Sequence, residues 1–369
     1  MLVPLHLIFA AFTTVGAATS HFPVCKKPHI RKEWRDMAKH EQKSFIDAVK
    51  CMGTKVPAAS SFFKIGWGGN VVPVLPPQER TLWDDFTYSH MDTNGHTHFV
   101  GSFLPWHRMF LRSMEAALQD HCGYTGGLPY WDWTLDVADL SKAPVFDPSP
   151  IYGFGTWGRA ANNWTITDGA FANWTRVYPW PHVISRRYEA QPFKIQGVYP
   201  LPYNHPNKWA NTTVTPAAIK ALIEGFKGDA YGFQVAIEGE RCEGLHSAMH
   251  YIFGPQTNVN QPGADMGDAS YSPNDPLFYL HHANMDRIWQ KWKDFHPANA
   301  QIVGGGTIKN LSLYDQYPQG LPPNATASDW LVTSGLSVNV TIGDVFNTMQ
   351  GYTCYLYQDP LEEKKGQDF

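Results

Sequence analysis

The chain has 369 residues, of which 43% are hydrophobic and 17% are charged. A chain of this length and composition can bury a large apolar core, which argues against an intrinsically disordered protein. The formal net charge is -4, and no dense run of lysine or arginine occurs. The basic surface typical of nucleic-acid-binding proteins is therefore missing, and we expect small or neutral partners instead.

The first segment, residues 3–18, is apolar, too short to span a membrane, and ends in small residues. It predicts a signal peptide over residues 1–18; an apolar N-terminal strand is the other interpretation, because no Lys or Arg precedes the apolar run. Glycosylation sequons support a secreted protein, and no membrane partner is expected. There are six, and N-linked glycans are expected at some of Asn163, Asn173, Asn211, Asn310, Asn324 and Asn339.

All five cysteines lie after this segment, and none belongs to a Cys-x-x-Cys pair. In a secreted chain they predict up to two disulfides and one remaining thiol, with a pairing that the sequence leaves open. The same pattern argues against zinc bound by thiolates. The cysteines are Cys25, Cys51, Cys122, Cys242 and Cys354.

Apolar residues recur at helical spacing in the first third of the chain. Residues 31–52 predict a surface helix with one apolar face. A second helix is expected to end at His90. A third is expected from about Pro105 to Gln119, because this stretch is rich in helix formers and proline is tolerated in a first turn.

The remainder of the chain alternates irregular and helical segments. Residues 144–206 are rich in Pro, Gly, Trp and Asn and predict long surface loops. Residues 216–240 predict a helix broken near Gly228, and residues 276–294 predict a last helix. After residue 304, short alternating runs indicate a few strands.

Two groups of three histidines, about 140 residues apart, are the most informative feature of the sequence. The first group is His90, His98 and His107, and the second is His246, His250 and His282. Residues four apart lie on the same helix face, so His246 and His250 can face one metal. Six imidazoles without carboxylates favour two metals in a nitrogen-only pocket.

These histidines do not match the zinc hydrolase helix motif. In His-Glu-x-x-His a glutamate follows the first histidine directly, whereas Ser247, Ala248 and Met249 separate the two here. A dinuclear zinc hydrolase would also recruit bridging Asp or Glu, and none adjoins these ligands.

The residues around both groups resemble a known family. The stretch from His98 through Phe103, Trp106, His107-Arg108 and Leu111 to Glu115 resembles the first copper signature of tyrosinases, catechol oxidases and molluscan haemocyanins. Asp275-Pro276-x-Phe278-Tyr279-x-x-His282-x-x-x-Asp286 resembles their second. The resemblance extends from Arg31, Trp34 and Arg35 to Tyr355-Leu-Tyr357, which is similar to the family's closing tyrosine motif.

The resemblance implies two copper ions, CuA held by the first histidine group and CuB by the second. It implies that His281, next to the last ligand, is not itself a ligand. Asp286 is expected to accept a hydrogen bond from a ligand imidazole, and Asn284 is a further candidate for this role. The remaining histidines that match no ligand position include His96, His121, His182 and His296.

Departures from the family pattern bear on the substrate. His96 stands where many fungal and molluscan members have the cysteine of a thioether crosslink, so that crosslink cannot form. Ser247 follows the first CuB histidine, where members that hydroxylate monophenols often have Asn. Glu238 is the candidate for the family's proton-accepting glutamate, with Glu240 and Glu243 as rivals.

We therefore expect a mainly α fold, with a four-helix core holding the dicopper site, long loops and a few short strands. Residues 19–369 are expected to form one catalytic domain without the family's C-terminal shielding domain. The implied function is a secreted polyphenol oxidase of the short fungal type that uses dioxygen to oxidise catechols, with some substituted monophenols, to o-quinones. The alternatives are true monophenol hydroxylation and haemocyanin-like oxygen binding.

Overall fold

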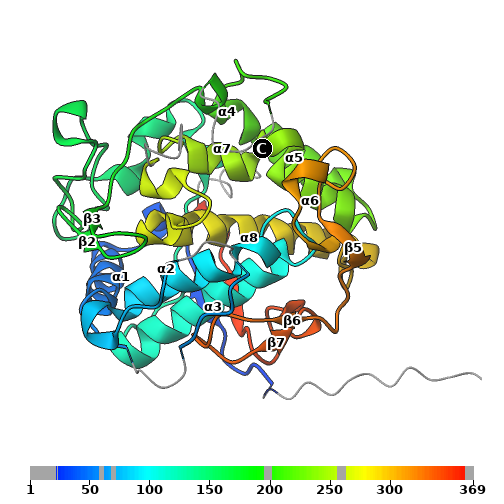
Figure 1. Cartoon of the computed structure of the whole chain (residues 1–369), viewed down its shortest axis with the longest axis horizontal. Helices are drawn as coiled ribbons and strands as arrows, with labels where there is room; N and C mark the ends of the chain where they lie inside the picture. The colour runs from blue at the N-terminus through cyan, green and yellow to red at the C-terminus, as the bar shows by residue number, and fades with distance from the viewer. Residues whose placement is uncertain are drawn as a thin grey trace, which may run out of the picture.

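The computed structural model describes residues 22, 24–57, 62–67, 72–194, 202–255 and 263–361, and it is mainly helical (Figure 1). The expected signal peptide lies outside these residues. Within them, no helix is long and apolar enough to cross a membrane. The helices are α1 (Lys39–Met52), α2 (Leu82–Thr93), α3 (Phe103–Cys122), α4 (Ala210–Thr213), α5 (Pro216–Gly225), α6 (Ala230–Glu238), α7 (Leu245–Tyr251) and α8 (Leu277–Phe295).

The strands are short and form two-stranded pairs in the described part of the chain. One pair is parallel and joins the two ends of the described chain: β1 (His29–Arg31) and β8 (Tyr355–Tyr357). The other pairs are antiparallel: β2 (Thr175–Arg176) with β3 (His182–Val183), β4 (Gly306–Ile308) with β5 (Leu321–Asn324), and β6 (Trp330–Leu331) with β7 (Val340–Thr341).

The helix prediction for residues 31–52 is wrong at its start. The helix α1 begins only at Lys39, because Arg31 pairs with Tyr357 in the parallel strands and residues 34–36 form a short 3-10 turn. The long-range strand pairing therefore overrides the local helical spacing. The predicted break near Gly228 is confirmed, since α5 ends at Gly225 and α6 begins at Ala230.

Local capping fixes the ends of the two helices that carry the first histidine group. At the start of α2, the Thr81 hydroxyl accepts from the Asp84 N–H, and the Asp84 carboxylate accepts from the Thr81 N–H at 2.7 Å. At the end of α3, Gly123 adopts φ +67°, a left-handed conformation that costs glycine little. These caps set where α2 begins and where α3 ends.

The helices α2, α3, α7 and α8 form the expected four-helix core, with α8 crossing the middle of the view in Figure 1. Ring contacts join α2 to α3 through Phe86 and Phe110, at 5.5 Å between centroids, and α2 to α8 through Trp83 and Tyr279, at 5.1 Å. The core is rich in tryptophan and phenylalanine, so the site is built inside a large apolar interior.

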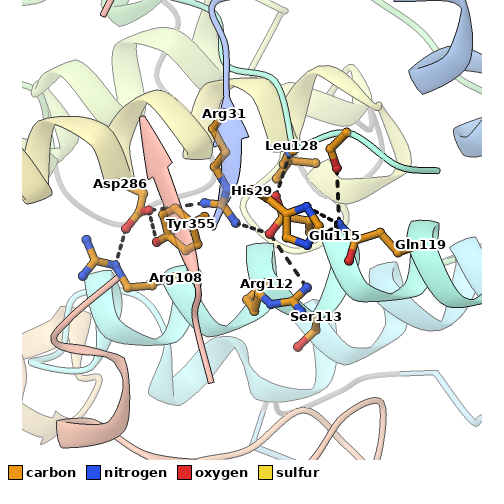
Figure 2. Close-up of polar contacts among 12 residues, drawn as sticks. His29, Arg31, Arg108, Arg112, Ser113, Glu115, Gln119, Leu128, Asp286 and Tyr355 are labelled. Carbon is orange, nitrogen blue, oxygen red and sulfur yellow. Dashed lines mark hydrogen bonds and ion pairs between the residues drawn. The ribbon is translucent and has the colours of Figure 1, made fainter. Parts of the chain in front are cut away.

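A buried network of charges connects the parallel strands to this core (Figure 2). The Arg31 guanidinium donates to both carboxylate oxygens of Glu115 on α3 at 3.2 Å, and it lies 3.5 Å from Asp286 on α8. Arg108 donates to Asp286 at 2.6 Å. Because each buried charge has a partner, the network holds α3 and α8 in a fixed relation.

Two disulfides and one thiol account for the cysteines, which confirms that prediction. Cys25 bonds to Cys354, close to the paired strands β1 and β8, and Cys51 at the end of α1 bonds to Cys122 at the end of α3. Cys242 is a buried thiol.

Candidate metal centre

The structure brings each predicted trio of histidines together. In the first group, His90 lies in the last turn of α2, His98 follows the short 3-10 turn after it, and His107 lies one turn into α3. In the second group, His246 and His250 lie one turn apart on α7, and α8 contributes His282. Within each group the candidate ligand nitrogens lie within 4.8 Å of one another, and all six side chains are buried.

The two groups face each other. The rings of His107 and His282 stack in parallel, with centroids 4.2 Å apart and an interplanar angle of 7°. His98 and His246 form a second contact between the groups, at 6.2 Å between centroids. The two groups therefore lie close enough to hold a pair of metal ions in one pocket.

Hydrogen bonds to carbonyl oxygens fix the orientation of three imidazoles. The Nδ1–H of His90 donates to Ser270 O at 2.7 Å, that of His107 to Phe103 O at 2.8 Å, and that of His250 to Met266 O at 2.8 Å. A carbonyl can only accept, so the proton lies on Nδ1 and the Nε2 lone pair is free for a metal.

The remaining nitrogens are buried and largely unpaired among the described residues. Nε2 of His90 and His107, and both ring nitrogens of His246, have no hydrogen-bond partner there. Nε2 of His250 and Nε2 of His282 point at each other, 3.2 Å apart. Buried nitrogens without partners are costly unless something binds them, so the arrangement fits a metal ion at each group.

Burial keeps these imidazoles in the form that binds metals. It lowers the pKa of His90 to about 3 and that of His250 to about 4, and it lowers the pKa of the other four well below the usual value. Neutral imidazole retains a lone pair, whereas the imidazolium ion does not.

His281 lies closer to the second group than the sequence indicates. The structure gathers it with His246, His250 and His282, with its ring parallel to that of His246 at 5.7 Å between centroids. Trp133 lies on His281 at 5.5 Å. The assignment of His282 as the ligand rests on the family motif. The helix period alone does not decide which of the adjacent residues His281 and His282 binds the metal.

The expected role of Asp286 is wrong. Its carboxylate accepts from Arg108 and from the hydroxyls of Tyr355 and Tyr357, and no ligand imidazole donates to it among the described contacts (Figure 2 draws Arg108 and Tyr355). Burial raises the pKa of Asp286, but the neighbouring guanidinium groups hold it below the usual value. Backbone carbonyls orient three of the ligands instead. Asn284 accepts from Arg287 at 3.5 Å.

Of the three candidate glutamates, Glu238 bonds to the residue next to a candidate ligand. It is fully buried, and its carboxylate accepts from the Phe99 N–H, adjacent to His98, at 3.2 Å. Phe99 has φ +54°, an uncommon conformation for a bulky residue. Burial raises the pKa of Glu238 to about 8.

The rival glutamates have other surroundings. Glu243 accepts from the His205 ring at 2.8 Å, and Glu240 is exposed. Ser247 is buried on α7 beside His246. His96, at the position of the family's crosslinking cysteine, packs against Trp67 with the rings tilted by 39° and their centroids 4.3 Å apart.

The fold and site define a class: helical proteins that hold two facing, histidine-only metal groups in a four-helix core. Comparison with known sequences identifies the family within this class. Residues 80–294 match the common central domain of tyrosinase, and the chain belongs to the tyrosinase family. It is therefore a copper oxidoreductase with a dicopper centre.

Several relatives cover nearly the whole chain. A tyrosinase-like protein of Diaporthe leptostromiformis, phomQ1, is 31% identical over 94% of this chain and 82% of its own length. The tyrosinase ustQ of Aspergillus flavus is 29% identical over 92% and 82%. The solved structure of a single-residue variant of a polyphenol oxidase from Thermothelomyces thermophila superimposes with a TM-score of 0.67 at 26% identity, covering 90% of this chain and 89% of that one.

Proposed function

We propose that the protein is a secreted polyphenol oxidase that oxidises catechols to o-quinones with dioxygen. The observation that carries the proposal is the facing pair of histidine groups, with His107 and His282 stacked between them. Six neutral imidazoles would hold CuA and CuB, and copper bound there would supply reversible one-electron chemistry and a binding place for dioxygen. In the overall reaction, two catechols lose four electrons and four protons, and one dioxygen becomes two water molecules.

The residues around the ligands include aromatic rings that line the pocket and a glutamate that could accept a proton. The Phe278 ring packs against His90 and against His282, with centroids 5.2 and 4.2 Å apart. The Phe103 ring packs against His246, with centroids 4.7 Å apart. These rings keep bulk water away from the ligands and favour an aromatic substrate. Glu238, whose pKa burial raises to about 8, is the candidate proton acceptor for a phenol hydroxyl in its ionised form.

Ser247 favours diphenol over monophenol oxidation. An asparagine at this position could orient a water molecule with both its carbonyl and its amide group, whereas a serine hydroxyl is shorter and reaches less far. We therefore expect catechol oxidation to exceed monophenol hydroxylation, and a Ser247→Asn variant to narrow the difference.

A substrate panel tests the proposal. Copper-loaded protein is assayed by oxygen uptake with 4-methylcatechol and with tyramine, alongside Ser247→Asn. Rapid oxygen uptake with the catechol and slow uptake with the monophenol support the assignment. Equal rates would show a tyrosinase with full monophenol activity, and copper-bound protein inert to both would favour an oxygen carrier. Zinc at both positions after copper-replete expression would favour a hydrolase.

Secretion and glycosylation belong to the same proposal. Four sequon asparagines are exposed: Asn163, Asn173, Asn324 and Asn339. The amide of Asn211, by contrast, donates to Val137 O at 2.9 Å and lies partly buried. Peptide mass spectrometry of protein secreted from a eukaryotic host should find glycans at exposed sequons and none at Asn211. Retention of the whole chain inside the host cells would contradict secretion.

A further inference from the structure

One short segment contacts both histidine groups. We call residues 264–274 the strap; it contains two 3-10 turns, η10 (Asp265–Gly267) and η11 (Ser272–Asn274). Its Met266 carbonyl accepts from His250 of the second group at 2.8 Å, and its Ser270 carbonyl accepts from His90 of the first at 2.7 Å. A shift of the strap would therefore rotate one imidazole at each metal position.

The buried carboxylate of Asp265 holds the strap to the surrounding loops. Its Oδ2 accepts from the Ser185 N–H at 2.9 Å and its Oδ1 accepts from the His182 ring at 2.7 Å, both outside the strap. Within the strap, its Oδ1 also accepts from the Asn274 amide at 3.1 Å. Asp265 directly precedes Met266, so these bonds fix the peptide that carries the first carbonyl.

His182, on β3, is the charged partner in this anchor. Its Nδ1 lies 2.6 Å from Trp180 O and its Nε2 lies 2.7 Å from the Asp265 carboxylate. Both neighbours are acceptors, so only the imidazolium ion, with a proton on each nitrogen, satisfies both contacts. Burial lowers the pKa of His182, but the bond and charge of Asp265 outweigh it, and the net pKa is raised. A charge-assisted pair of this kind is stronger than a neutral hydrogen bond.

We propose that His182 and Asp265 are positioning residues for the dicopper centre, acting through the strap on His250 and on His90. The proposal rests on the proposed function, because it assumes that the two histidine groups bind copper. Neither residue contacts a candidate ligand directly, so neither belongs to the ligand set. Their effect should reach both ions together, since the same short segment carries both carbonyls.

The test compares two variants that each remove one histidine from a histidine–carboxylate pair. His182→Phe keeps a flat ring but removes both N–H donors to the anchor. His205→Phe is the matched control, because His205 pairs with Glu243 at 2.8 Å but does not contact the strap. Copper(I) affinity is measured by competition with a chromogenic chelator. Ring N–H exchange of the copper-free protein is measured by NMR after labelling histidine with nitrogen-15.

We expect His182→Phe to weaken binding of both copper ions about tenfold, as other changes to groups that orient metal ligands do. We also expect it to speed ring N–H exchange at His90 and His250, with no change in His205→Phe. Weakening of one ion alone, or affinities and exchange rates equal to the control, would overturn the proposal. Should His182→Phe fail to fold, Asp265→Asn replaces it with the same expected outcomes.

The two readouts separate this proposal from the proposed function. Wild-type protein that binds fewer than two copper ions contradicts the dicopper assignment, while the exchange measurement on the copper-free protein still tests the strap. Wild-type protein that binds two ions, with His182→Phe indistinguishable from it, contradicts the strap alone.

Discussion

Lys293, on α8, is a buried amine whose removal should stabilise the protein. Its Nζ has no hydrogen-bond partner among the described residues and lies over the rings of Trp289 and Phe346, 4.9 and 4.2 Å from their centroids. Burial and the nearby charge of Arg108 lower the pKa of Lys293, while Asp286 and Asp294 oppose the shift, and the net pKa is about 6. Folding at pH 7 therefore removes a proton from this side chain.

The magnitude follows from the two pKa values. The pKa of lysine in the unfolded chain is about 10.4, so pH 7 lies more than 3 pH units below it. At about 1.4 kcal/mol per pH unit, deprotonating Lys293 at pH 7 costs about 4–5 kcal/mol. The neutral amine present at pH 7 gains little from the two ring faces, because these attract a charged amine. Methionine has a similar length and no charge, so Lys293→Met should raise the free energy of unfolding by up to about 4 kcal/mol at pH 7.

The sign of the pH dependence provides a second check. Between pH 6 and 10 the unfolded lysine binds a proton that the folded one lacks, so wild-type stability rises with pH through this side chain. The advantage of Lys293→Met should therefore be largest near pH 6 and shrink toward pH 10. Urea unfolding, followed by tryptophan fluorescence at several pH values, measures the difference in unfolding free energy between Lys293→Met and the wild type. Lys43→Met, at an exposed position, is the control and should change stability by less than about 0.5 kcal/mol. A destabilised Lys293→Met, or a gain independent of pH, would refute the reasoning.

Three further predictions concern other parts of the molecule. Arg186→Met should destabilise the fold by about 3–5 kcal/mol in urea unfolding, because it leaves the buried carboxylate of Asp275, which now accepts at 2.6 and 2.8 Å, without its partner; a loss below about 1 kcal/mol would contradict this. Replacing Cys51 and Cys122 together by serine should cost about 4 kcal/mol, since their disulfide closes a loop of about 70 residues, and an unchanged melting temperature would argue against it. Glu238→Gln should slow tyramine hydroxylation about 100-fold and leave 4-methylcatechol oxidation within about threefold; an equal loss with both substrates would exclude a role as phenol base.

The sequence by itself determined the chemistry of the site. The spacing of His246 and His250 places both rings on one helix face, because the helix period is local and does not depend on the rest of the chain. The absence of adjacent carboxylates and the two long motifs pointed to copper, and the break near Gly228 followed from local propensity. The cysteine count likewise predicted two disulfides and one thiol.

Only the tertiary structure decided which groups surround the ligands. Asp286 turned out to pair with Arg108 and two tyrosines, and the carbonyls of Met266 and Ser270 orient the imidazoles in its place. Every residue has a backbone carbonyl, so no residue type in the sequence marks one as an acceptor. The late start of α1 and the pairing of Asp265 with His182 depend in the same way on contacts between distant segments. Such contacts arise from packing of the whole chain, which local periodicity does not encode.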